Sequence, residues 1–283
     1  MTASISPNPS TDGNSLAWRT RAALLTADPR DKAQAALTLA RDWRAGRIAD
    51  IGRVDAPERP GRPDRPELLP PTKVPRRKIG PGPAGRAALL HALAHIELNA
   101  IDLALDMLIR FPAEDMPRAF LDDWLQVAGE EGTHFLLLAD RLAELDSHYG
   151  AMPAHDGLWQ TAIDTTDDLL ARLAIVPLVL EARGLDVTPA MIEKLNSVGD
   201  GASAEALKII YRDEVGHVAI GMRWFRFLAE RRGVAVEASW TAIVRARFPG
   251  RVKPPFNEEA RGRAGFPPAL YTSVVQDEGT DVA

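Results

Sequence analysis

The 283-residue sequence contains no cysteine. This absence excludes disulfide bonds, thiolate zinc sites, iron–sulfur clusters and a cysteine nucleophile. Any transition-metal site in the chain must therefore use imidazole and carboxylate ligands, a donor set that suits iron or manganese. Hydrophobic residues (46%) and charged residues (26%) are in the usual balance of a globular protein that can bury a substantial core.

Long hydrophobic runs and a strong net charge are also missing. The longest apolar run, around Leu173 to Leu180, is interrupted by Pro177 and is shorter than the ~20 residues that cross a bilayer. The polar N-terminus lacks the basic and apolar pattern of a signal peptide, so we expect a cytoplasmic protein without a membrane partner. The net charge of −5 gives no general attraction to nucleic acid.

Alternating strand patterns are absent, and helical patterns cover most of the chain, so we predict an all-α protein. Its expected parts are a disordered tail (1–17), N-terminal helices with a proline- and arginine-rich strap (18–83), a four-helix bundle (84–233), and a short helix with a second irregular strap (234–283). The long helices of the bundle are expected at about 84–111, 115–149, 156–183 and 203–232. Helices of this length favour a bundle over a globin-like or α/β arrangement.

Two of the expected long helices carry the motif Glu-x-x-His, at Glu131 to His134 and at Glu214 to His217. Residues three apart on a helix lie on the same face, so each motif can direct two ligands towards one point. The motif alone is a weak signal, because four-residue patterns of this kind occur freely by chance. Its value depends on what the other two long helices contribute.

Each of the other two long helices places one glutamate, Glu97 or Glu181, in the middle of an apolar stripe. Leu90 and Ile101, for example, fall within about 40° of Glu97 when each residue is advanced by 100°. An isolated buried carboxylate costs more than the ~5–15 kcal/mol by which a typical protein is stable. These glutamates must therefore be neutralised by protons, by basic partners or by cations.

The glutamates also occur in a repeated order. Glu97 precedes Glu131 by 34 residues and Glu181 precedes Glu214 by 33, so the chain contains two similar helical hairpins. Two-metal carboxylate bundles use one Glu from each of two helices and Glu-x-x-His from each of the other two. The predicted ligands are Glu97, Glu131, His134, Glu181, Glu214 and His217. The predicted cofactor is a pair of metal ions, iron first, with manganese or a mixed Mn/Fe pair as the alternatives.

Glu97, Glu181 and the arginines of the straps each have an alternative interpretation. Glu97 and Glu181 would alternatively pair with arginine at a helix interface, and Arg172 and Arg183 are close in sequence. Arginine does not account for the two Glu-x-x-His motifs or for their symmetry, so the metal interpretation is preferred. The arginines of the two straps are expected to pair with surplus acids at the surface, with an anionic substrate as the alternative.

The remaining histidines and one tyrosine receive weaker predictions. His95 lies about 160° from Glu97 on the helix and is not expected to reach the metals. His91 and His155 are candidate pocket residues, and His155 is expected to cap the loop before the third long helix. Tyr211, three residues before Glu214, is a weak catalytic candidate as a proton-donating or redox-active phenol and is otherwise a core residue.

Six segments together resemble a bacterial ferritin-like family of largely uncharacterised function, which is distantly similar to MiaE-type tRNA hydroxylases. The resemblance covers the chain from about residue 24 to 271. It implies that the six predicted ligands form the metal site and that Glu130 and Asp213, which precede the two motif glutamates, orient the histidines. The segments are HALAHIELNAIDLALD (91–106), EEGTH (130–134), PAHDGLW (153–159), LVLEARGLDVTP (178–189), IYRDEVGHVAIGMRWF (210–225) and PPFNEEARGRAG (254–265).

The motifs and the resemblance together predict an O2-activating enzyme with a dinuclear non-haem iron or Mn/Fe site, a hydroxylase or other oxygenase. The alternatives are a tRNA- or nucleotide-modifying hydroxylase, a ferroxidase or peroxidase that handles metal, and a non-enzymatic helical protein. The expected partners are O2 and a small-molecule or nucleotide substrate. The sequence leaves open the electron donor, the substrate and the oligomeric state, with a homodimer as one option.

Overall fold

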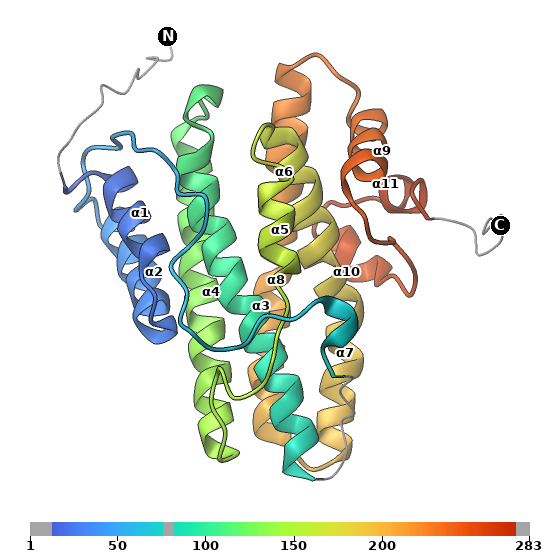
Figure 1. The fold of residues 1–283 in the computed structure, drawn as a ribbon. Helices are drawn as coiled ribbons and strands as arrows, with labels where there is room; N and C mark the ends of the chain where they lie inside the picture. The colour runs from blue at the N-terminus through green and yellow to red at the C-terminus, as the bar shows by residue number, and fades with distance from the viewer. Residues whose placement is uncertain (1–12, 76–81, 276–283) are drawn as a thin grey trace. The chain divides into compact units, whose positions relative to one another are not determined.

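The computed structural model describes residues 13–75 and 82–275, and over these ranges it is all-α, as predicted. The described residues contain no named strand and only one isolated bridge, between Leu68 and Ala154. The chain divides into two compact units, one ending at Gln160 and the other beginning at Thr161. The two units are coloured blue to green and yellow to red in Figure 1.

The first unit is built on α3 (Pro83–Arg110) and α4 (Arg118–Glu144), which form a helical hairpin (Figure 1). Helices α1 (Leu16–Leu25) and α2 (Pro29–Arg44) pack on this hairpin, α1 against α3 and α2 mainly against α4. The hydroxyl of Ser15 and the carboxylate of Asp28 cap the two short helices. The predicted tail (1–17) overlaps α1, because α1 begins at Leu16; Ser15 and Leu16 are both buried. Residues 1–12 lie outside the described residues.

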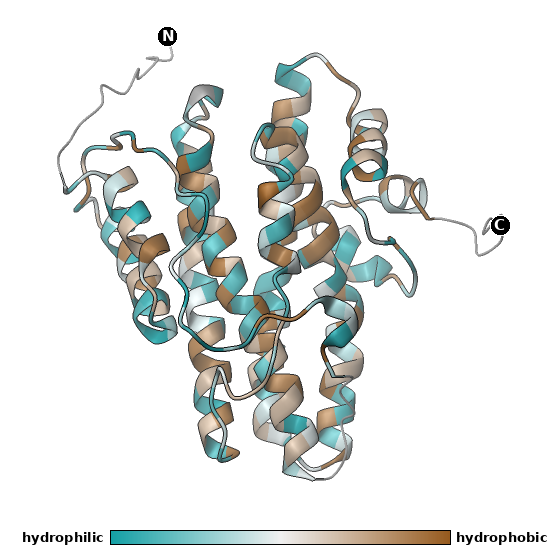
Figure 2. Ribbon diagram, in the orientation of Figure 1, coloured by the Kyte–Doolittle hydropathy of each residue, from teal (hydrophilic) through white to brown (hydrophobic). Residues whose placement is uncertain are grey.

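Two glycines let α2 approach α4 closely. A Cβ at Gly132 would lie 2.7 Å from the carbonyl oxygen of Ala33, and a Cβ at Gly129 would lie 2.9 Å from the Cβ of Ala40. Both separations are too short for real side chains, so only glycine permits this packing. Figure 2 shows that α2 carries both hydrophobic and hydrophilic residues, and its buried residues include Ala33, Ala36 and Leu39.

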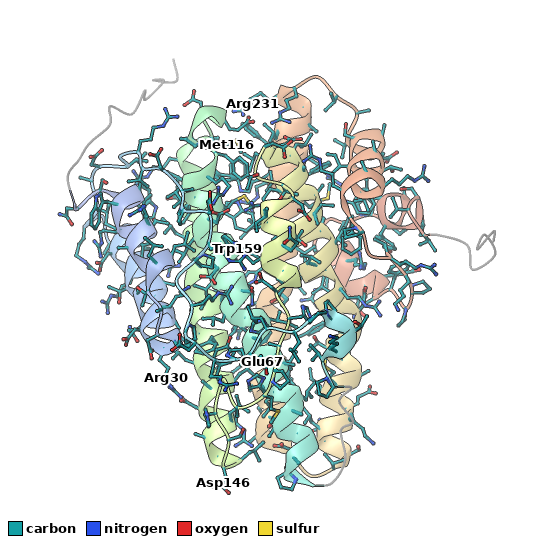
Figure 3. All side chains as sticks on the ribbon, viewed as in Figure 1. Arg30, Glu67, Met116, Asp146, Trp159 and Arg231 are labelled. Atoms are coloured by element: carbon teal, nitrogen blue, oxygen red, sulfur yellow. The ribbon has the colours of Figure 1, made fainter. Side chains whose placement is uncertain are left out.

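The proline-rich segment that follows α2, predicted to be a strap, contains a single 3₁₀ turn at Pro71–Lys73 as far as it is described. Its backbone carbonyls accept hydrogen bonds from side chains of the helices. Arg110 donates to Pro57 (2.5 Å), and Trp159, labelled in Figure 3, donates to Glu58 (3.2 Å). Helix donors thus satisfy part of a backbone that prolines keep out of regular structure.

The second unit contains α6 (Leu169–Ile175), a π-helical segment (η3, Val176–Glu181), α7 (Ala182–Ser197) and α8 (Gly201–Arg231). Helices α9 (Val236–Arg247), α10 (Glu258–Arg263) and α11 (Pro268–Thr272) complete it. The segment after residue 248 is therefore more helical than the irregular strap expected there. A Cβ at Gly221 would lie 2.3 Å from that of Pro177, so α8 contacts the π segment closely.

The third long helix, expected over 156–183, is interrupted. Helix α5 (Gly157–Ile163) ends where the hydroxyls of Thr165 and Thr166 donate to carbonyls of the preceding turn. The Asp168 carboxylate then accepts from the Leu170 N–H and starts α6. Side-chain hydrogen bonds to the local backbone compete with the helix here, which helical composition alone does not reveal.

The helix also continues past Gly184, where it was expected to end, and absorbs Pro189 into α7. Proline has no N–H, so the carbonyl of Leu185 loses its helical donor. The side-chain amide of Asn257 donates to that carbonyl (3.1 Å) and replaces the missing bond. A residue 68 positions away thus allows the helix to pass through proline.

Candidate metal centre

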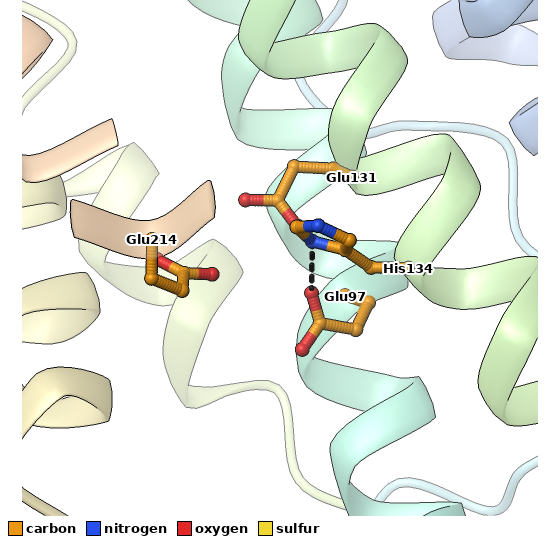
Figure 4. Close-up of side chains that lie close together, drawn as sticks. All are labelled: Glu97, Glu131, His134 and Glu214. Atoms are coloured by element: carbon orange, nitrogen blue, oxygen red, sulfur yellow. Dashed lines mark hydrogen bonds and ion pairs between the residues drawn. The ribbon is translucent and has the colours of Figure 1, made fainter. Parts of the chain in front are cut away.

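The first unit places a cluster of three predicted ligands in its interior. Glu97 comes from α3, and Glu131 and His134 come from α4 (Figure 4). Each offers one ligand atom, and these atoms lie within 4.8 Å of one another. Nδ1 of His134 lies 3.4 Å from Oε2 of Glu97 and 3.2 Å from Oε2 of Glu131. The structure therefore contains a buried Glu/His cluster of a composition that can bind a metal ion.

The cluster is shielded from solvent. Glu131 and His134 have no exposed surface, and Glu97 is 4% exposed. Burial, together with the charge of Glu131, raises the pKa of Glu97 well above its usual value. Two carboxylates at one buried position disfavour each other's ionised form, and a cation between them would reverse this effect.

The second unit contains the other three predicted ligands. Glu214 and His217 lie one turn apart on α8, with 3.7 Å between Oε2 of Glu214 and Nδ1 of His217. Figure 4 also draws Glu214. Glu181 is the last residue of the π segment η3, and it is partly buried. In both units the motif thus directs Nδ1 of the histidine towards the glutamate three residues earlier.

The arginines considered as alternative partners make hydrogen bonds to other residues of the second unit. Arg172, fully buried, donates to the Thr165 hydroxyl (2.7 Å) and to the Ala162 carbonyl (2.6 Å). Arg183 donates to the carbonyls of Lys253 (2.9 Å) and Pro255 (3.1 Å). These bonds give both guanidinium groups structural roles in the second unit.

The residues predicted to support the metal ligands have contacts of their own. Glu130 accepts a hydrogen bond from Gln126 (3.0 Å), and Asp213 accepts one from Arg212 (2.8 Å). The Tyr211 hydroxyl accepts from the Asn257 side chain (2.9 Å), which ties it to the segment before α10. The roles of Glu130 and Asp213 in orienting the histidines, and of Tyr211 in catalysis, stay predictions.

The candidate pocket histidines lie together in the first unit. Nδ1 of His155 accepts the N–H of Gly157 (3.2 Å), so it caps the turn into α5 as predicted. Nε2 of His91 accepts the N–H of Gly150 (2.9 Å). His95 reaches the His155 carbonyl through Nε2 (3.0 Å). Burial lowers the pKa of His95 to about 4, which keeps its ring neutral.

Sequence reasoning missed a second row of buried polar residues on α3, formed by His91, His95, Asn99, Asp102 and Asp106. Asp102 is its centre: Lys32 approaches one carboxylate oxygen (2.5 Å) and Arg62 of the strap approaches the other (2.7 Å). The row is spaced by three or four residues, the period of one helix face. That spacing is the signal in the sequence that predicts the row.

Fold and cluster together define an all-α protein with a buried carboxylate–imidazole group. The chain belongs to the family described as "Protein of unknown function (DUF455)", whose model matches residues 25–272. It is 44% identical over 206 residues to a protein of Haemophilus influenzae described as "Uncharacterized protein", covering 71% of each chain. No solved structure matches it. Among the described residues, no helix has the length and apolar character needed to cross a membrane.

Proposed function

We propose that Glu97, Glu131, His134, Glu181, Glu214 and His217 bind a pair of metal ions, and that the protein is a ferritin-like O2-activating oxidoreductase. The observation that carries the proposal is the repetition itself. Each unit holds a helical Glu-x-x-His motif with Nδ1 of His turned towards Glu, at 3.2 Å in the first and 3.7 Å in the second. Each unit also supplies one further glutamate, Glu97 or Glu181.

The donor atoms fit such a pair of cations. Four carboxylates and two imidazoles form an oxygen-rich donor set, which suits iron and manganese. His134 and His217 have no exposed surface, so their binding to metal would take place away from bulk water. The printed sequence offers no thiolate that would favour zinc or a cluster.

The side chains have distinct tasks in this proposal. When bound, a pair of reduced iron ions supplies the two electrons for reducing O2. The carboxylates would balance the positive charge of the ions, and His134 and His217 would supply nitrogen ligands. The π segment of the second unit sets the position of Glu181, because π turns shift the register of every following residue relative to an α-helix.

Three arginines that are paired with carboxylates favour a small molecule over a nucleotide as the substrate. Arg62 pairs with Asp102, Arg59 pairs with Asp156, and Arg247 binds Asp167 through two nitrogens. Guanidinium groups already held by carboxylates contribute little additional attraction for phosphate. We therefore favour a small organic molecule over tRNA or a nucleotide as the substrate.

Oxygen consumption by Fe(II)-loaded protein tests this proposal. The metal-free chain is loaded anaerobically with Fe(II) and mixed with air-saturated buffer at an oxygen electrode. We expect rapid uptake of about one O2 for each pair of Fe(II) ions. Glu214→Gln on α8 should lose most of this uptake, whereas Glu205→Gln, an exposed residue of the same helix paired with Lys208, should retain it. Uptake no faster than that of Fe(II) alone would contradict the proposal.

A further inference from the structure

The segment before α10 contacts the residues that immediately follow Glu181 in the second unit. The guanidinium of Arg183 donates to two backbone carbonyls of this segment (2.9 and 3.1 Å). The backbone N–H of Asn257 donates to the Asp186 carboxylate (2.9 Å), and its side-chain amide donates to the Leu185 carbonyl (3.1 Å). The segment therefore follows the first turn of α7, which begins directly after a proposed metal ligand.

The side-chain amide of Asn257 connects two helices of this unit. Its nitrogen donates to the Leu185 carbonyl of α7 (3.1 Å) and to the Tyr211 hydroxyl of α8 (2.9 Å). An amide nitrogen carries two N–H groups, so both bonds can form at once. The amide oxygen accepts the N–H of Ala260 (3.1 Å) and caps α10. Both polar atoms of the side chain are thus engaged, and together they fix its position.

The two ends of this bridge lie close in sequence to proposed metal ligands. Leu185 follows Glu181 by four residues, about one helical turn, and Tyr211 precedes Glu214 by three. Residues separated by three or four positions are neighbours on a helix surface. The amide of Asn257 therefore joins the backbone one turn after Glu181 to the side chain one turn before Glu214.

A second contact holds the same helices on the other side of these glutamates. Because α7 and α8 are joined by a short turn and pack on each other, they run in opposite directions. Pro177, four residues before Glu181, packs against Gly221, which follows Glu214 by seven residues. Along the helices, Glu181 and Glu214 thus lie between this close contact and the Asn257 bridge.

We propose that Asn257 is a positioning residue that sets the separation and orientation of Glu181 and Glu214 for binding metal. This inference rests on the proposed function, because it concerns two ligands of the same site. The contact at Gly221 holds one end of the helix pair, and the bridge holds the other. Removing groups that orient metal ligands typically lowers metal affinity by roughly 10- to 100-fold.

Asn257 also supplies the donor that Pro189 denies to the Leu185 carbonyl. Loss of its amide would therefore destabilise α7 whether or not it positions ligands. Pro189→Ala separates the two roles, because alanine returns a backbone N–H to Leu185 within α7 but adds no bond to Tyr211. Asn257→Ser removes the bridge and keeps a side-chain oxygen at the N-cap of α10, where serine is favoured.

The affinity of the full chain for Mn(II) is measured by electron paramagnetic resonance of the unbound ion, and the Tm of the metal-free protein by circular dichroism. We expect Asn257→Ser to lower the Tm and to weaken Mn(II) binding roughly tenfold or more. Adding Pro189→Ala should restore most of the Tm but not the affinity. Asn196→Ser, the same replacement at an exposed position near the end of α7, is the control and should change neither.

The inference is overturned if Asn257→Ser binds Mn(II) as tightly as the wild type. It is also overturned if Pro189→Ala restores the affinity together with the Tm, because repair of α7 would then be the whole role of Asn257. A wild-type protein that binds no Mn(II) would instead contradict the proposed function, and the positioning role would fall with it.

Discussion

Replacing Glu97 with glutamine is expected to stabilise the metal-free protein and to weaken its response to metal. Glutamine keeps the shape of the side chain but removes a buried carboxylate whose pKa is raised by burial and by Glu131. The gain in the metal-free state should be about 1–2 kcal/mol, or roughly 2–6 °C in Tm. In the wild type, Fe(II) at a hundredfold excess over its Kd should add about 2.7 kcal/mol, and the variant should lose most of this increment.

Scanning calorimetry with and without Fe(II), under anaerobic conditions, measures both effects. Glu144→Gln is the matched control, because Glu144 lies at the end of α4 with a 63% exposed side chain paired with Arg141. It should change neither the metal-free Tm nor the shift caused by Fe(II). A Glu97→Gln protein that is less stable without metal, yet responds fully to Fe(II), would mean that Glu97 has a structural role.

The second large effect is expected at Arg261. This buried arginine makes two hydrogen bonds to Asp186 (2.8 and 2.7 Å) and lies over the rings of Phe256, Phe266 and Tyr271. Arg261→Met would leave the Asp186 charge buried without this partner, a change that typically costs about 3–5 kcal/mol. Urea unfolding followed by circular dichroism measures the loss.

Two further variants show whether the loss comes from the stranded charge. Asp186→Leu combined with Arg261→Met should recover part of the stability, because no buried charge remains. Arg247→Met breaks an exposed pair with Asp167 and should cost no more than about 1 kcal/mol. If the double variant is as unstable as Arg261→Met, packing around the aromatic rings accounts for the effect instead.

These contacts also give a structural reason for the segment PPFNEEARGRAG. Asn257 caps α10, donates to the carbonyl that Pro189 leaves without a helical donor, and reaches Tyr211. Arg261 holds α10 on α7 through Asp186. The segment therefore fastens α10 to α7, the helix that follows Glu181.

The all-α class and the local geometry of the glutamate motifs could be predicted because both depend on helical periodicity. Glu97 lies where the apolar stripe placed it, with Leu90 and Ile101 buried on the same side of α3. The motif Glu131 to His134 brings its two side chains together in the way that three-residue spacing requires. Such arguments need only residues that are close in sequence.

Features that depend on distant residues could not be predicted in this way. The passage of α7 through Pro189 relies on Asn257, and the burial of Asp102 relies on Lys32 and Arg62. Helix composition likewise gave no sign of the break at Thr165 and Thr166, where hydroxyls compete for backbone carbonyls. In each case a side chain satisfies a backbone or charged group that local rules would leave unsatisfied.

The most direct test of the two-metal site is the metal content of the purified full chain, measured by mass spectrometry after anaerobic loading with Fe(II) and Mn(II) and removal of unbound ions. We predict about two iron or manganese ions per chain, as six shared ligands of this kind require. A folded protein that retains no stoichiometric metal, or that binds only one ion, would contradict the dinuclear site.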